Sequence, residues 1–205
     1  MSEPRSTLAA EARLAAVLAA RPRALQGDLD PRPIPELGRS AVDAAVLVLL
    51  ERGDGYRMVF TKRTEHVETH KGEVSFAGGM RDPGDADARA TALREAEEEI
   101  GVEPCDVLVL GELDPLVTVT GFRVTPVVGA VDAGTVYRPN PREVERILRV
   151  PMAHLRDPAQ WFEDVRAWRG TLHRLRSCRY GEDVIWGATS RMLQNFLTAV
   201  PPDLL

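Results

Sequence analysis

The chain has 205 residues, 44% of them hydrophobic and 28% charged, with a formal net charge of −5 at pH 7. This composition is ordinary for a globular protein, and the length suffices for one domain that buries roughly 70% of its unfolded surface. The negative charge argues against a nucleic-acid partner, which normally meets a basic field. The two cysteines, Cys105 and Cys178, are too few for a disulfide framework or a four-cysteine metal site. No apolar run approaches the roughly 18 residues of a membrane span, so we expect a cytoplasmic protein without a membrane partner.

Hydrophobic periodicity and turn residues divide the chain into groups of helices and strands. The expected helices span 6–24, 85–101, 141–150 and 187–200; the expected strands span 41–51, 56–63, 73–79, two or three stretches of 106–132, and a hairpin over 161–180. A loop rich in Pro and Gly follows the first helix, so we expect residues 1–38 to pack as a helix and loop on a domain formed by 39–205. This order favours an α/β sandwich with a mixed sheet over a regular βαβ series.

The segment 94–101, REAEEEIG, crowds four glutamates into five positions at the end of an expected helix. Because an α-helix turns about 100° per residue, Glu95, Glu98 and Glu99 fall within an arc of about 100°. Glu97 points away from them. Like charges at these spacings cost about 0.2 to 0.5 kcal/mol per pair, and a divalent cation would relieve that cost. The alternative is a solvated acidic face held by salt bridges.

The opposite side of the same helix is apolar and can pack on the sheet. It carries Leu93, Ala96 and Ile100. An Asp near the start of the helix can cap it, and Gly101 suits a left-handed stop. The acidic side is therefore backed by an apolar face that would hold it against the fold.

The stretch 79–102 resembles the signature of the Nudix hydrolases: Gly, five spacers, Glu, seven spacers, then Arg-Glu-aliphatic-x-Glu-Glu-x-Gly-aliphatic. The second half matches in REAEEEIGV, residues 94–102, with an alanine in the aliphatic slot. The first half departs, since Gly79 precedes the arginine by 15 residues, one more than in the signature. The slot for the first Glu holds an alanine flanked by Asp85 and Asp87, and either Asp can serve its outer-sphere role.

The resemblance implies an α+β Nudix fold, a mixed β-sheet sandwiched between α-helices, and hydrolysis of a phosphoanhydride in a nucleoside diphosphate derivative. It implies Mg²⁺ or Mn²⁺ as cofactor and a small-molecule nucleotide as partner; the oligomeric state stays open, a homodimer included. The implied metal ligands are Glu95, Glu98 and Glu99, and the implied catalytic residues are Glu95, Glu98 and Arg94. Arg94 is expected to hold a Glu carboxylate rather than to touch substrate; an ordinary intrahelical salt bridge is the alternative. The general base stays open among a glutamate of the motif, Glu143 and Glu145, the last two having helix-surface solvation as the alternative.

Residues 59–79, VFTKRTEHVETHKGEVSFAGG, look like the segment that marks coenzyme A pyrophosphatases among Nudix proteins, and 184–193 are similar to that subfamily's closing IWG-x-T helix. Thr61 also matches this pattern. The implied substrate-binding residues are Arg63, His70, Gly72, Phe76, Gly78 and Gly79. The implied reaction splits coenzyme A or acyl-CoA into a 4′-phosphopantetheine species and adenosine 3′,5′-bisphosphate.

Two departures leave the substrate open: Glu68 stands where the subfamily has Arg, and Ala77 replaces a Pro. ADP-ribose or a dinucleotide is the alternative substrate. A non-catalytic nucleotide-binding module and an acidic protein-interaction surface are the alternative functions. His66 and His70 have a spacing that suits zinc, but no third ligand follows in register, so a hydrogen-bonding role is favoured for His70. Four residues, among them Phe76, are expected in the core rather than stacked on substrate; the set is Met58, Phe60, Phe76 and Trp186.

Overall fold

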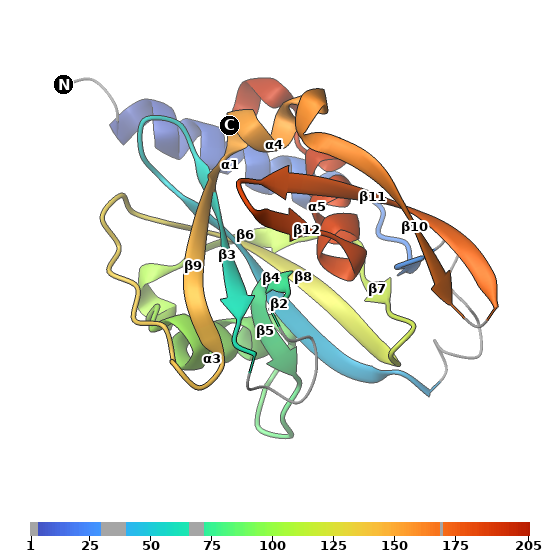
Figure 1. Ribbon diagram of the computed structural model, residues 1–205. Helices are drawn as coiled ribbons and strands as arrows, with labels where there is room; N and C mark the ends of the chain where they lie inside the picture. Colours follow the sequence, from blue (N-terminus) through green and yellow to red (C-terminus); the bar gives the residue numbers. More distant parts are fainter. Residues whose placement is uncertain (1–3, 30–39, 66–71, 169) are drawn as a thin grey trace.

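The computed structural model describes residues 4–29, 40–65, 72–168 and 170–205 (Figure 1). Its helices are α1 (Pro4–Ala20), α3 (Ala88–Ile100), α4 (Met152–Arg156) and α5 (Gly187–Ala199). Its strands are β1 (Gln26–Gly27), β2 (Val42–Glu51), β3 (Arg57–Arg63), β4 (Val74–Ser75), β5 (Ala77–Met80), β6 (Leu108–Glu112), β7 (Leu116–Val117), β8 (Phe122–Val131), β9 (Val144–Pro151), β10 (Trp161–Trp168), β11 (Thr171–Tyr180) and β12 (Asp183–Ile185). None of the helices in these ranges is long and apolar enough to cross a membrane.

Most strands join one mixed sheet in the order β1-β7-β8-β2-β3-β4, with β5 paired to β2, β6 to β8 and β9 to β3. Strands β2 and β8 run parallel over their full lengths, whereas β2 and β3 form the expected antiparallel hairpin. β2 is buried along most of its length, as its continuous apolar sequence predicts. The last three strands, β10-β11-β12, form a separate antiparallel sheet.

Helices cover both faces of the mixed sheet, which confirms the expected sandwich (Figure 1). On one face, Ala92, Ala96 and Ile100 of α3 are buried against strand residues such as Leu47 and Val127. On the other face, a larger core contains buried side chains of α1 and α5 together with side chains from both sheets. Burial of the apolar side of α3 thus fixes the direction in which the acidic side of this helix points.

One element was predicted wrongly: residues 141–150 form no helix, and Val144–Pro151 is strand β9. Val144, Leu148 and Val150 are buried, and β9 pairs with β3 along its whole length. Charged residues stand between the apolar ones, so the run could be read with either period. The segment forms a strand because pairing with β3 satisfies its backbone hydrogen bonds and buries its β-branched side chains.

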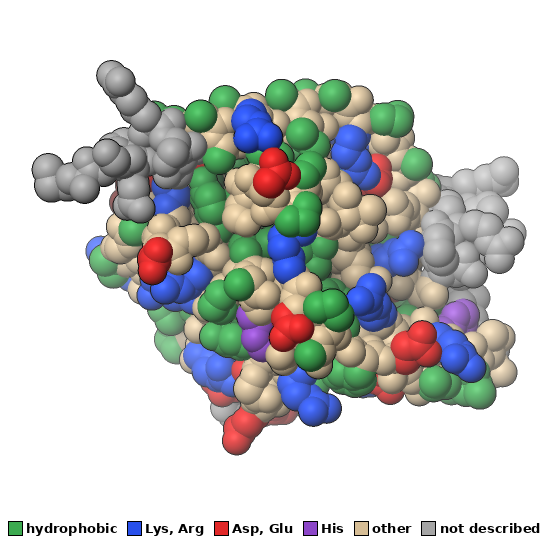
Figure 2. All heavy atoms as spheres, turned by 90° about the horizontal axis from the view of Figure 1, so that it is seen from above, with side chains coloured by type: hydrophobic (Ala, Val, Ile, Leu, Met, Phe, Trp, Pro, Cys, Tyr) green, Lys and Arg blue, Asp and Glu red, His purple; other side chains and the backbone are tan. Residues whose placement is uncertain are grey.

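The sheet β10-β11-β12 carries arginines stacked on aromatic rings. Arg166 lies 4.0 Å from the ring centroid of Trp186, so this Trp is half-buried under a cation and the expectation of a core position is wrong for it. Met58 and Phe60 are buried as expected. In the view of Figure 2, basic, acidic and hydrophobic side chains are interspersed over the described surface.

Candidate metal and catalytic site

The helix that carries the glutamates, α3, has defined ends. Its N-cap is Asp87, whose carboxylate accepts a hydrogen bond of 2.9 Å from the backbone N–H of Ala90. It ends at Gly101, which adopts φ 67° and donates to the carbonyl of Glu97. Leu93, expected on the packing side, is partly buried there beside Ala96 and Ile100. These ends fix the rotation of the helix, and with it the direction of each glutamate.

The glutamates of α3 lie in three different environments. Glu99 is only 3% exposed, Glu95 is half-buried, and Glu98 is exposed. Glu97 is also exposed, on the side away from the sheet. The expected acidic side of the helix therefore grades from the protein interior to solvent.

Glu99 is a buried carboxylate with little compensation. The backbone N–H of Gly78 donates to it at 3.3 Å, and Arg63 reaches it at 3.6 Å. Burial raises the pKa of Glu99 to about 8, and the negative charges of Glu143 and Glu95 act in the same direction, against the effect of Arg63. A group that is costly to ionise in isolation is a good ligand for a cation that shares its site.

Glu95 lies directly against the glycine pair of β5. A Cβ atom on Gly79 would fall 2.6 Å from the Glu95 carboxylate, and one on Gly78 would fall 2.3 Å from the carbonyl oxygen of Ala45. Burial raises the pKa of Glu95, with Arg94 opposing and the charges of Glu98 and Glu143 adding to the rise. Both glycines are therefore needed for backbone approach, Gly78 to β2 and Gly79 to the carboxylate.

Arg94 holds the loop before α3 to the acidic cluster. Its Nε and Nη2 donate to the two carboxylate oxygens of Asp85 at 3.1 and 3.0 Å, and Nη2 also donates to the carbonyl of Met80. Nη1 lies 2.9 Å from Glu95 and 3.4 Å from Glu98. The arginine therefore makes intrahelical pairs with Glu95 and Glu98 and also ties the helix to Asp85 in the preceding loop.

The two aspartates beside the missing glutamate have separate tasks. Asp85 binds Arg94 with both oxygens, and this pairing holds the pKa of Asp85 well below its usual range. The other, Asp87, is the helix cap. Among the described contacts, neither carboxylate binds Glu95 or Glu99 directly. Asp85 instead fixes Arg94, and it does so from a loop that is one residue longer than in the Nudix signature.

Glu143 adds a further negative charge near the site from a distant part of the chain. It directly precedes β9, and its charge raises the pKa of both Glu95 and Glu99. The side chain of Asn140 donates to it at 3.5 Å. Glu145, in contrast, is exposed and lies 3.9 Å from Arg146. The helix predicted over 141–150 gave no reason to distinguish Glu143 from Glu145. A strand over Val144 to Val150 would have predicted different surroundings for the two glutamates.

The other expected substrate-binding residues have different surroundings. Arg63 faces Glu99, and its buried Nε has no hydrogen-bond partner among the residues that the structure describes. Gly72 adopts φ 64°, where a side chain would be strained. Phe76 is 2% exposed and stacks on Phe60 with ring centroids 4.7 Å apart, so its ring lies in the core as expected, and its contact with substrate stays a prediction. His70, like His66 and Glu68, lies outside the described residues.

The donor set fits a hard divalent cation. Carboxylate oxygens are the ligands that Mg²⁺ and Mn²⁺ prefer, and the buried Glu99 has the half-buried Glu95 and the charge of Glu143 near it. As the described side chains stand, no three His, Cys, Asp or Glu groups are close enough to hold an ion. The ion pairs of Arg94 and Arg63 bind the same carboxylates, so a metal would have to displace part of them.

Comparison with known proteins bears on this arrangement. A family model described as NUDIX domain matches residues 41–169. A protein named Uncharacterized Nudix hydrolase NudL from Escherichia coli (strain K12) is 36% identical over 163 residues, which cover 78% of this chain and 85% of the relative. The protein of that name from Shigella boydii serotype 18 is 35% identical with the same coverage. A solved MutT/nudix family protein from Enterococcus faecalis has a TM-score of 0.50 and 14% identity, covering 78% of this chain and 62% of that chain, a likeness of fold.

Proposed function

Since this chain belongs to the Nudix family and is a Nudix pyrophosphohydrolase, we propose that it cleaves coenzyme A or acyl-CoA with Mg²⁺ or Mn²⁺. Water adds to one phosphorus of the diphosphate and the bridging P–O bond breaks. The products are a 4′-phosphopantetheine species and adenosine 3′,5′-bisphosphate. In this proposal, the glutamates of α3 are the metal ligands, and Arg63 at the end of β3 is the first substrate-binding residue next to them.

The buried position of Glu99 is the observation that carries the proposal. A carboxylate that is 3% exposed, near two other acids and 3.6 Å from its arginine, costs stability in the metal-free protein. Such a cost is common where a group is kept for function. Glu99 and Glu95 would therefore hold the ion, with Glu98 completing the set from its exposed position.

A bound divalent cation would neutralise the diphosphate and lower the pKa of a water bound to it. The protein's own groups supply the rest. Arg94, held by Asp85, keeps the Glu95 carboxylate turned toward β5. Arg63, whose Nε has no partner within the described parts of the chain, would donate to a substrate phosphate once a cation takes over its interaction with Glu99.

For the general base, the surroundings of Glu143 and Glu145 support a choice between these two residues. Glu143 is half-buried, its charge raises the pKa of Glu95 and Glu99, and the side chain of Asn140 donates to it at 3.5 Å. Glu145 is exposed beside Arg146. We therefore place the proton-accepting role on Glu143 in preference to Glu145, because a base must lie within hydrogen-bond reach of the attacking water.

One departure from the coenzyme A pattern has a structural explanation. Ala77, which replaces Pro, is 4% exposed and lies in β5 opposite Leu47 of β2. Its side chain packs in the core on the α3 side of the sheet. The change therefore affects strand packing and gives no reason to abandon coenzyme A as substrate.

The test is a panel of coenzyme A, acetyl-CoA, ADP-ribose and a diadenosine polyphosphate, each incubated with Mg²⁺ or Mn²⁺ and with chelator. Mass spectrometry should show adenosine 3′,5′-bisphosphate from the first two, and chelator should stop its formation. Intact coenzyme A beside hydrolysed ADP-ribose or dinucleotide would transfer the assignment to the alternative substrates. Binding of nucleotides without turnover of any would instead indicate a non-catalytic module.

A further inference from the structure

A buried carboxylate outside the acidic cluster holds two cations from different strands. Asp183, the first residue of β12, is 5% exposed. Its Oδ1 accepts a hydrogen bond of 3.1 Å from the ammonium group of Lys62 on β3. Its Oδ2 accepts one of 2.6 Å from the Nη2 of Arg146 on β9. The two cations therefore converge on one anion, and the trio carries a net positive charge.

With respect to the described residues, both cations keep unused hydrogen-bond donors. An ammonium group has three N–H bonds and a guanidinium has five, and each gives one hydrogen bond to Asp183. The side chain of Lys62 is 24% exposed and that of Arg146 is 45% exposed. Glu145 lies 3.9 Å from Arg146, a distance that exceeds a hydrogen-bond length. Donors fixed in place and open to solvent can bind an anion with little loss of side-chain entropy.

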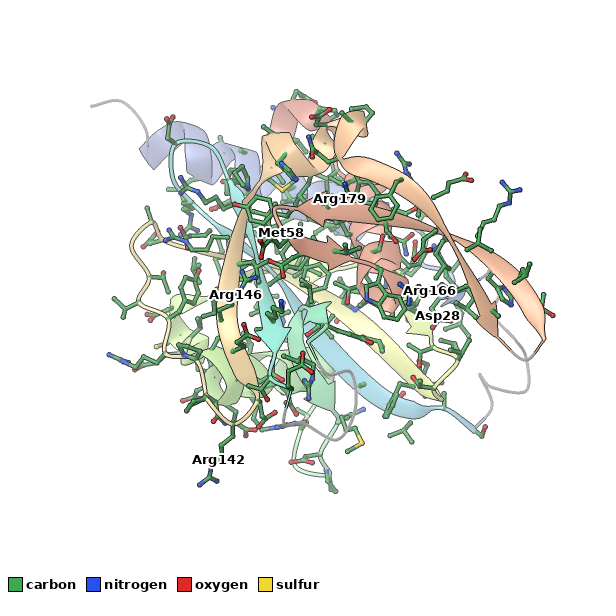
Figure 3. All side chains as sticks on the ribbon, viewed as in Figure 1. Asp28, Met58, Arg142, Arg146, Arg166 and Arg179 are labelled. Atoms are coloured by element: carbon green, nitrogen blue, oxygen red, sulfur yellow. The ribbon has the colours of Figure 1, made fainter. Side chains whose placement is uncertain are left out.

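The position of this pair relates it to the candidate site. Lys62 pairs with Asp183 of β12, whereas the next residue, Arg63, reaches Glu99 of α3, so the two places lie on opposite faces of the sheet and share the end of β3. Arg146 follows Glu143 by three residues, about 10 Å along an extended strand. The register between β3 and β9 shifts between Lys62 and Arg63, and such an irregularity re-aims side chains at a strand end. Figure 3 shows Arg146 on β9 beside the arrowhead of β3.

We propose that Lys62 and Arg146, held in place by Asp183, form a subsite for the 3′-phosphate of the adenosine moiety. The inference rests on the proposed function, since coenzyme A carries a phosphate monoester separated from its diphosphate by a single ribose. Two cations on one side of the ribose match that dianion, as the cluster of Glu95 and Glu99 with its metal matches the diphosphate. The subsite selects coenzyme A over nucleoside diphosphate derivatives that lack the 3′-phosphate.

The test compares coenzyme A with 3′-dephospho-coenzyme A, which differs only in this phosphate. The wild-type protein should have a kcat/KM for coenzyme A roughly 10- to 100-fold above that for the dephospho form, the range expected for losing a charged hydrogen bond. Lys62→Met and Arg146→Met should each move this ratio toward one, mainly through the KM for coenzyme A. Lys62→Arg, which keeps the charge, should restore most of the preference.

Arg142→Met is the matched control. Arg142 lies just before β9, is exposed, and projects away from the molecule (Figure 3); its replacement removes the same charge and should leave the preference ratio as it is. An equal kcat/KM for the two substrates in the wild-type protein would overturn the subsite while the proposed hydrolase stands. Variants with a lower Tm and an equal loss of kcat/KM for both substrates would show that the trio only joins the two sheets. That result would also overturn the subsite. A wild-type protein that cleaves neither substrate would remove both proposals.

Discussion

The replacement Glu99→Gln tests the burial of the central carboxylate through stability as well as through activity. The folded pKa of Glu99 is raised from 4.5 to about 8, chiefly by burial. A raised pKa means that the stability contribution of the neutral acid is complete below pH 4.5 and is lost as the pH rises through 8. In the unfolded chain this carboxyl group is ionised at pH 7. Folding must therefore either protonate it or bury its charge, which lowers the free energy of unfolding by about 3 kcal/mol.

An uncharged amide of the same shape removes that cost. We therefore expect Glu99→Gln to stabilise the metal-free protein by about 3 kcal/mol at pH 7, which corresponds to a rise in Tm of roughly 6 to 12 °C. The wild-type protein should lose stability between pH 5 and 8 in chelator, and the variant should not. Added Mg²⁺ should stabilise only the wild-type protein, and the variant should have no turnover, because an amide binds Mg²⁺ poorly.

The measurement is denaturant unfolding in chelator at several pH values, with Glu97→Gln as control. Glu97 is exposed on the same helix, so its replacement should leave the pH slope and the turnover as in the wild type. Equal pH slopes for the wild-type and Glu99→Gln proteins would show that burial of Glu99 is not costly. Near-normal turnover of Glu99→Gln would remove this residue from the proposed metal site.

Three further changes test the supports of the site. Asp85→Asn should lower kcat about 10- to 100-fold with little change in Tm, because the amide loses the charged pair that fixes Arg94; an unchanged kcat would refute that support. Gly79→Ala should abolish activity, since a methyl group would lie 2.6 Å from a carboxylate, whereas Gly84→Ala, in open space, should match the wild type in kinetic assays. Phe76→Ala should lower the free energy of unfolding by about 3 to 5 kcal/mol in denaturant titrations, while a loss confined to KM would return its ring to the substrate site.

Local sequence predicted the elements whose pattern is complete within a few turns. Helix α3 begins after its Asp cap and ends at Gly101 as expected, and the hairpin of β2 and β3 follows from two apolar runs around a glycine turn. The mixed sheet between helices was likewise predictable from the order of elements. The segment 141–150 was not, because its apolar spacing suits either period and β3, about 80 residues earlier in the chain, decides between them.

The sequence by itself determined which side chains can share the flank of α3, because helix periodicity and end residues act over one or two turns. Only the tertiary structure decided how each of them is used. It buries Glu99 while leaving Glu98 in solvent, brings Glu143 from the start of β9 toward both inner acids, and pairs Asp85 with Arg94. Burial and long-range charge depend on which strands become neighbours, and that choice is made by the packing of the whole core.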